Sequence, residues 1–158
     1  MQLILWRHAE AEDADGKDDL ARALTKKGHA QAARMAKWLK PRLGSDWRIL
    51  VSPARRALET VEPLGRDYAV EEAIAPGRSA RDVLRAAGWP SNGNNVMVVG
   101  HQPTLGEVAS MIFLGEEGEA GIRKGAIWWF EARGGGDKMN AILKAVLSPD
   151  LAGDPEKP

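Results

Sequence analysis

The stretch Leu3-Ile4-Leu5-Trp6-Arg7-His8 decides how this chain is interpreted. Four consecutive apolar residues close to the N-terminus predict a strand that is buried on both faces of a sheet. The strand ends at Arg7 and His8, which places two hydrogen-bonding side chains at its carboxyl end. Ligands of open α/β sheets bind at the carboxyl ends of the strands, so we expect both side chains to line a crevice. A dipeptide alone is weak evidence, because Arg7 and His8 could equally begin a solvated loop.

The same pattern occurs twice more along the chain. Residues 48–51 run into Ser52-Pro53-Ala54-Arg55-Arg56, and residues 96–99 run into Gly100-His101-Gln102-Pro103. If the three strands are parallel neighbours, their carboxyl ends gather two histidines and two or three arginines around one crevice. Arginines bind phosphoryl oxygens bidentately, and a neutral imidazole nitrogen can act as a nucleophile. This set of side chains therefore suits a phosphoryl group.

Length and composition limit the classes of protein that this chain can represent. Its 158 residues suffice for one domain, which we expect over residues 1–149, followed by a frayed tail at 150–158. The 22 basic and 22 acidic residues balance, so no overall charge favours nucleic acid or an anionic membrane. The absence of cysteine excludes disulfides and thiolate chemistry. Without a basic leader or a long apolar run, we expect a soluble cytoplasmic protein.

Capping signals predict four helices, which begin at Thr25, Ser52, Ser79 and Thr104 and end near Pro41, Glu62, Ala87 and Leu114. The Ser52 hydroxyl would cap the second helix, with Pro53 at its first position. Thr104 and Glu107 would form a capping box for the fourth. Residues 126–132 and 140–147 predict an antiparallel hairpin. We therefore expect an α/β fold of three layers, with helices on both faces of a mostly parallel, mixed central sheet.

Metal binding is the rival chemistry for the predicted crevice. The chain has three histidines, no two of which stand at the i,i+2 or i,i+4 spacing that would suit a shared metal. The third, His29, lies among lysines and glutamine and is interpreted as a surface residue. The arginines would also place positive charge beside any cation. We therefore expect neither a metal nor another cofactor.

Four motifs occur along the chain in a fixed order: Arg7-His8-Ala9, Leu24-Thr25-x-x-Gly28-x-x-Gln31-Ala32, Leu50-Val51-Ser52-Pro53-x-x-Arg56-Ala57-x-x-Thr60 and Val99-Gly100-His101-Gln102-Pro103. Together they resemble the histidine phosphatase superfamily, a phosphoglycerate-mutase-like group, and most closely its short phosphohistidine phosphatase branch of the SixA type. The resemblance implies a phosphoglycerate-mutase-like α/β fold. It also implies that His8 is phosphorylated during turnover.

The resemblance assigns the other site residues by their positions in these motifs. Arg7, Arg56 and His101 would bind the phosphoryl group. The family spacing Ser-Pro-x-x-Arg-Ala selects Arg56 over its neighbour, whereas the residues alone do not separate the two. Arg55 then becomes a rim residue or a solvated side chain, and Gln102 is a second candidate for the rim.

The chain departs from the family pattern where a general acid is expected. Superfamily members that act on phosphate esters usually carry a glutamate after the second helix, in a glycine pattern that residues 73–77 do not reproduce. We therefore assign neither Glu71 nor Glu72 as the acid. An alkoxide leaving group needs a proton, whereas the imidazole of phosphohistidine can be protonated before its P–N bond breaks. The missing acid favours phosphohistidine on a protein, such as a phosphotransfer domain, as the substrate.

Two other functions remain open. A small-molecule phosphomonoesterase of broad specificity would use the same four residues, and an open site without a lid could admit a small phosphorylated molecule equally well. A non-catalytic phosphate-binding module would predict damage to the nucleophile or the anion clamp, and Arg7, His8, Arg56 and His101 are all present. A mutase is disfavoured, because it must shield a phosphorylated intermediate from water and this chain is short for that purpose.

Overall fold

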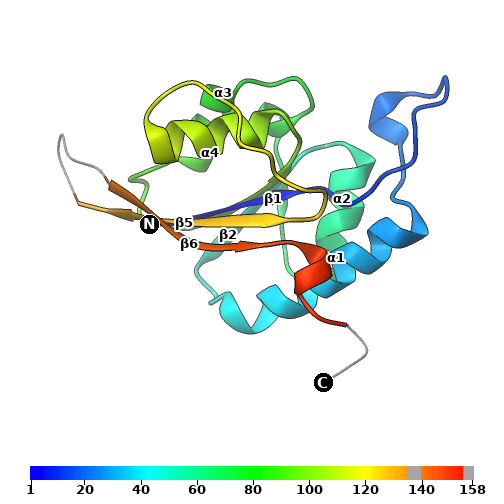
Figure 1. Ribbon diagram of the computed structural model, residues 1–158, viewed down its shortest axis with the longest axis horizontal. Coiled ribbons are helices and arrows are strands. Elements are labelled where there is room, and N and C mark those ends of the chain that lie inside the picture. Colours follow the sequence, from blue (N-terminus) through cyan, green and yellow to red (C-terminus); the bar gives the residue numbers. More distant parts are fainter. Residues whose placement is uncertain (135–139, 155–158) are drawn as a thin grey trace.

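The computed structural model describes residues 1–134 and 140–154, which form a six-stranded sheet between two layers of helices (Figure 1). The strands are β1 (Gln2–Arg7), β2 (Trp47–Val51), β3 (Ala69–Val70), β4 (Asn95–Gly100), β5 (Ile127–Arg133) and β6 (Asn140–Leu147). The helices are α1 (Lys26–Leu39), α2 (Arg55–Val61), α3 (Ala80–Ala87) and α4 (Thr104–Leu114). Short 3-10 helices are η1 (Asp19–Ala21), η2 (Lys40–Arg42), η3 (Glu62–Leu64), η4 (Glu72–Ile74) and η5 (Pro149–Leu151).

The sheet is mixed and mostly parallel, as predicted. Its strand order is β3-β2-β4-β1-β5-β6, with the first four strands parallel and the β5–β6 hairpin antiparallel. Strand β4 lies between β1 and β2, with Gly100 opposite Arg7 and Val99 opposite Val51. The three predicted strands therefore end side by side. The hairpin turn expected at residues 133–137 lies mostly outside the described residues, as does the end of the expected tail at 155–158.

Burial on both faces explains why β1 carries four apolar residues in a row. Ile4 and Trp6 pack in one cluster, and Leu3 and Leu5 pack in the other. Helices α1 and α2 cover the first face of the sheet, and α3 and α4 cover the second (Figure 1). All four side chains are fully buried. Each contributes about 1.5–3 kcal/mol through the removal of apolar surface from water. This confirms the predicted three-layer architecture and fixes β1 at the centre of the fold.

The predicted start of the second helix was wrong. Helix α2 begins at Arg55, its N-cap is Ala54, and no side chain caps it. The Ser52 hydroxyl instead accepts a hydrogen bond from the Ala54 amide at 3.2 Å and lies 2.7 Å from the His101 ring. The turn at residues 52–54 thus holds Ser52 in the crevice at the end of β2, and a tertiary contact replaces the expected cap.

The capping box predicted for the fourth helix was also wrong. Pro103 occupies the N-cap position of α4, and the Thr104 hydroxyl donates to the backbone carbonyl of Arg78 at 2.9 Å. The residue before Pro103 supplies the cap instead, because Gln102 Oε1 accepts from the Gly106 amide at 2.7 Å. The caps expected from Thr25 for α1 and from Ser79 for α3 are confirmed.

The segment between β1 and α1 is tied to the first turn of α1. The Glu10 carbonyl accepts from the Thr25 amide at 3.0 Å, and Ala11 and Leu24 form an isolated β-bridge. A Cβ at position 28 would collide with the same Glu10 carbonyl, so only glycine permits this approach. Gly28 therefore lets α1 sit directly against the chain that leaves the end of β1.

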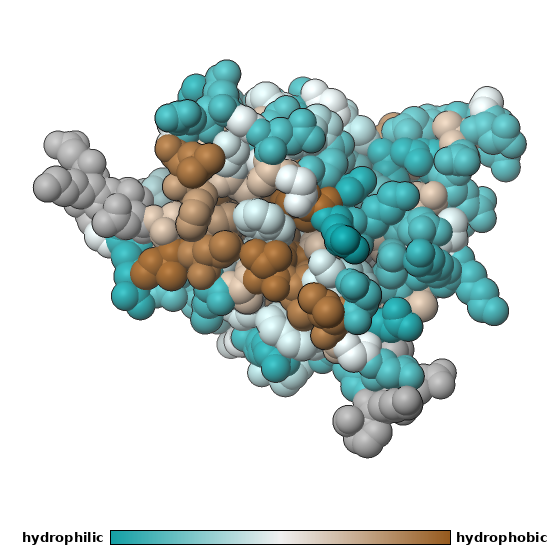
Figure 2. All heavy atoms as spheres, in the orientation of Figure 1, coloured by the Kyte–Doolittle hydropathy of each residue, from teal (hydrophilic) through white to brown (hydrophobic). Residues whose placement is uncertain are grey.

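Hydrophobic surface gathers where β6 and the end of α4 reach the outside (Figure 2). The exposed large hydrophobic side chains of these two elements are Phe113, Leu114, Ile142 and Val146. No helix within the described ranges has the length and apolar character needed to cross a bilayer.

Candidate active site

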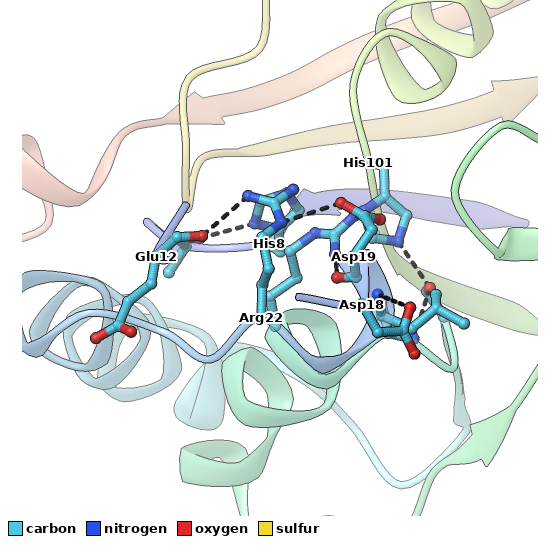
Figure 3. Close-up of polar contacts among 11 residues, drawn as sticks. His8, Glu12, Asp18, Asp19, Arg22 and His101 are labelled. Atoms are coloured by element: carbon cyan, nitrogen blue, oxygen red, sulfur yellow. Dashed lines mark hydrogen bonds and ion pairs between the residues drawn. The ribbon is translucent and has the colours of Figure 1, made fainter. Parts of the chain in front are cut away.

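Two histidines face each other where β1 and β4 end (Figure 3). The ring centroids of His8 and His101 are 5.2 Å apart, and the His8 amide donates to the Gly100 carbonyl at 3.0 Å. A pocket of about 210 Å³ opens here, and its lining includes both histidines, Arg7 and Arg56. The structure therefore brings together all four residues that the sequence placed in one site.

The His8 ring is held in one tautomer with a free nitrogen. Its Nδ1 lies 2.7 Å from the Ala9 carbonyl, which can only accept, so Nδ1 carries the hydrogen and Nε2 keeps its lone pair. The Ala9 amide is fixed in turn by Thr60 Oγ1 at 3.0 Å. Burial lowers the pKa of His8 to about 4, opposed by the Ala9 carbonyl and reinforced by the charges of Arg56 and Arg7. The imidazole is therefore neutral and nucleophilic at neutral pH.

The two arginines are anchored through part of each guanidinium. Arg7 Nη1 donates to the Ile122 carbonyl at 2.7 Å, and Arg56 Nη1 donates to the Asp19 carbonyl at 2.8 Å. Arg56 Nη2 also donates to Asp19 Oδ2 at 3.1 Å. Burial lowers the pKa of Arg7 and of Arg56, although both guanidinium groups stay protonated at neutral pH. The site thus holds two fixed positive charges beside two neutral imidazoles.

Ser52 orients the second histidine. Its hydroxyl lies 2.7 Å from His101 Nε2 and accepts from the Ala54 amide. When this hydroxyl donates to Nε2, the neutral ring carries its hydrogen on Nδ1. Burial, reinforced by the charges of His8 and Arg56, lowers the pKa of His101 to about 3. His101 is then a neutral hydrogen-bond donor.

Three buried side-chain nitrogen atoms in the described part of the chain have no hydrogen-bond partner, and all three belong to this site. They are Arg7 Nε, Arg56 Nε and His101 Nδ1. A buried polar group without a partner costs about 1–3 kcal/mol, and such groups are rare in native proteins. An anion with several acceptor oxygens would satisfy such donors. The geometry therefore suits a tetrahedral oxyanion such as a phosphoryl group.

Two residues of the site were not foreseen from the sequence. Asp19 on η1 bridges the site, because its Oδ1 accepts from Arg22 Nε at 3.0 Å while its Oδ2 binds Arg56 (Figure 3). Arg22 Nη1 also donates to the Glu12 carbonyl at 3.1 Å. Burial alone would raise the pKa of Asp19, but the charges and hydrogen bonds of Arg56 and Arg22 lower it overall. The i,i+3 spacing of Asp19 and Arg22 was a possible signal, yet nothing local connects it with Arg56.

Of the two rim candidates, Gln102 lines the pocket and Arg55 takes the solvated alternative. Gln102 does line the pocket, but its Nε2 donates to the Ala120 carbonyl at 3.0 Å and its Oε1 caps α4. The structure does not bring Arg55 to the pocket, since its Nε donates to Glu59 on the surface at 2.8 Å. Asp13 and Lys124, which lie outside the four sequence motifs, complete part of the rim.

The two glutamates considered as general acids lie outside the pocket lining. Glu71 Oε1 accepts from the Ala73 amide, and Glu72 lies 3.9 Å from Arg78. Within residues 1–134 and 140–154, no three histidine or acidic side chains are placed to hold a metal ion.

The chain is similar to characterised and uncharacterised proteins. The family model of the histidine phosphatase superfamily (branch 1) matches residues 3–78. An uncharacterized protein of Picosynechococcus sp. is 35% identical over 144 residues, which cover 80% of this chain and 87% of that protein. Phosphohistidine phosphatase SixA of Escherichia coli is 40% identical over 65 residues, 41% of this chain and 40% of that protein. The solved structure of the protein histidine phosphatase SixA complexed with tungstate is similar at a TM-score of 0.79 and 28% identity, covering 95% and 98% of the two chains.

Proposed function

The chain belongs to the histidine phosphatase superfamily, and from this premise we propose that it hydrolyses phosphohistidine on protein substrates through a covalent phospho-His8 intermediate. The observation that carries the proposal is the set of three unpartnered buried nitrogens, on Arg7, Arg56 and His101, around a neutral His8. They suit a phosphoryl group whose phosphorus faces the His8 ring. The name of the SixA relative and of the similar structure agrees with this substrate.

Binding uses the fixed donors of the pocket. Arg7, Arg56 and His101 donate to the phosphoryl oxygens, on which negative charge is spread during transfer. Because these donors are buried and already oriented, little reorganisation is needed when the charge shifts.

The chemistry follows in two displacements. His8 Nε2 attacks phosphorus while the P–N bond of the substrate breaks, and the substrate imidazole leaves with a proton that it took up beforehand. The hydrogen on His8 Nδ1 stays in its bond to the Ala9 carbonyl, which supports the positive charge that the ring gains. Water then attacks the phosphorus of phospho-His8, releases inorganic phosphate and restores the neutral ring.

The proposal is tested with a protein phosphorylated on histidine. We expect phosphate release together with a labelled enzyme intermediate that rapid quenching can capture. His8→Ala should lower the rate by about 10⁴-fold or more and abolish the label. His29→Ala is the matched control, because His29 is an exposed histidine that pairs with Glu59 outside the pocket. Label on the His8→Ala variant would reject His8 as the nucleophile.

A second candidate function is favoured by one observation. Asp13 lines the pocket, so a carboxyl group is available near the leaving group of a small phosphate ester. A phosphomonoesterase would need such an acid, whereas phosphohistidine hydrolysis would not. The Asp13→Asn variant separates the two functions when kcat/KM is measured on phosphohistidine and on simple phosphate esters. Higher wild-type kcat/KM on the esters, lost selectively in Asp13→Asn, would favour the esterase.

A further inference from the structure

A second hollow adjoins the candidate active site. It has a volume of about 470 Å³ and shares Arg7 and Lys124 with the smaller pocket around His8. Its lining also contains Arg34 of α1 and Arg123 of the segment before β5. The two hollows therefore adjoin at Arg7 and Lys124, and we call the second one the basic groove.

Cations outnumber carboxylates in the basic groove. Five cationic side chains line it, namely Arg7, Lys27, Arg34, Arg123 and Lys124, together with the carboxylates Glu10 and Asp150. Glu10 is already engaged, because Oε1 accepts from the Thr25 hydroxyl at 3.1 Å and Oε2 lies 3.8 Å from Lys27.

Three of these cations have no partner of their own in the described part of the chain. Arg34, Arg123 and Lys124 take part in no ion pair or side-chain hydrogen bond there. Their combined field is therefore open to an anion in the groove.

The segment before β5, which forms one wall of the groove, is held against the end of β1 by hydrogen bonds of its backbone. The Gly125 amide donates to the His8 carbonyl at 3.0 Å, and the Gly125 carbonyl accepts from Trp6 Nε1 at 3.0 Å. Gly125 has a φ of 74°, which favours glycine. Arg7 holds the same segment through the Ile122 carbonyl. The backbone that carries Arg123 is thus fixed relative to the proposed nucleophile.

The opposite wall is fixed as well. Gln31 Oε1 accepts from the Glu10 amide at 2.9 Å, and Gly28 brings α1 against the Glu10 carbonyl. Arg34 follows Gln31 by three residues and so lies on the same face of α1. Cations from two separate elements therefore face one groove whose backbone needs no rearrangement.

We propose that the basic groove binds carboxylates of the phosphorylated protein that lie next to its phosphohistidine. This inference rests on the proposed function and adds a recognition site to it. The cations are carried on long side chains around a wide groove, and Lys27 is 72% exposed. Interspersed with Glu10 and Asp150, they match carboxylates spaced along a polypeptide better than the dense charge of a compact polyphosphate.

The test compares two phosphohistidine peptides, one flanked by glutamates and one by glutamines. Wild type should show a kcat/KM about 10-fold higher for the glutamate peptide at low salt, and added salt should reduce this preference. The double variant Arg34→Glu/Arg123→Glu should abolish or reverse the preference and leave the glutamine peptide within about two-fold. Lys124 stays unchanged because it also lines the catalytic pocket.

The matched control is Arg48→Glu/Arg85→Glu, which makes the same change in net charge on β2 and α3, outside both hollows. It should keep the glutamate preference. Loss of the preference in this control as well would overturn the proposed role of the groove, because the change in net charge alone would then explain the effect.

A binding measurement separates failure of the groove from failure of the proposed function. Hexaglutamate and tripolyphosphate are each titrated against wild type and the Arg34→Glu/Arg123→Glu variant. Weaker hexaglutamate binding to the variant, with neither peptide hydrolysed by wild type, would support the groove and reject the function. Hydrolysis of both peptides at equal rates, with hexaglutamate binding unchanged, would overturn the groove alone. A variant that loses only tripolyphosphate would also overturn it, in favour of a small-anion site.

Discussion

The floor and the rim of the candidate site are built in different ways. The floor residues Arg7, His8 and His101 follow directly from β1 and β4, and both histidines are less than 10% exposed. The rim residues Asp19 and Arg22 lie on and directly after the short 3-10 helix η1, between β1 and α1, with side chains 52% and 23% exposed. Under the proposed function, the phosphoryl group is transferred where backbone neighbours fix the geometry, and the substrate is recognised where side chains can adjust. Floor variants should therefore change mainly kcat, and rim variants mainly KM.

Arg56 should show the largest effect, because it joins the floor to the rim. Its side chain is 4% exposed, and its Nε is one of the three unpartnered nitrogens. Arg56→Ala should lower kcat/KM by about 10³-fold, the usual cost of losing a donor to developing negative charge. Arg55→Ala is the matched control, since this neighbour pairs with Glu59 on the surface, and it should stay within about two-fold. Equal losses in the two variants would show that the pocket is wrongly assigned.

The free energy of unfolding should depend on pH because the two histidines of the floor are buried. The pKa of His8 is about 4 and that of His101 about 3, against an ordinary value of 6.5. As pH falls below 6.5, the unfolded chain binds protons that the native rings exclude, so the free energy of unfolding decreases until the native rings also titrate. We expect a loss on the order of a few kcal/mol between pH 6.5 and about 4.

Urea unfolding at several pH values measures this loss. His8→Gln and His101→Gln should each make the pH dependence shallower, because one fewer ring takes up a proton on unfolding. An unchanged slope in both variants would mean that the rings are not held neutral by burial. The floor would then lack the neutral imidazole that the proposed role of His8 as a nucleophile requires.

The same division explains what could be predicted from the sequence. The floor followed from local signals, because an apolar run ending in Arg7 and His8 implies a buried strand whose carboxyl end faces ligands. The rim did not, because Asp19 and Arg56 stand 37 residues apart and meet only through tertiary packing. Ser52 shows the limit most clearly. A serine before proline has the same local pattern whether its hydroxyl caps a helix or faces a histidine 49 residues away.

Ser52 gives the next prediction, because it supports the floor without facing the substrate. Ser52→Ala removes the group beside His101 Nε2 and leaves the tautomer of that ring unfixed. We expect kcat to fall by about 10–10²-fold with little change in KM. Nitrogen NMR of the His101 ring would show the mixed tautomers directly. Ser79→Ala is the control. It removes the N-cap of α3, so it should lower the stability of the protein while leaving kcat unchanged. A normal His101 tautomer in Ser52→Ala would contradict the assigned role.

The smallest effects should come from the rim. Removing either partner of the Asp19–Arg22 ion pair should change KM, in opposite directions for the two partners. Arg22→Gln removes a cation from the pocket lining and should raise KM about 3-fold at constant kcat. Asp19→Asn removes a carboxylate that shares Arg56 with the incoming phosphoryl group, so KM should fall about 2-fold. Both shifts should shrink at high salt, because Asp19 is half exposed. A higher KM in Asp19→Asn would mean that this carboxylate orients Arg56 for the substrate rather than competing with it. Asp19 would then belong to the floor, even though its backbone lies on η1 and not on a strand of the sheet.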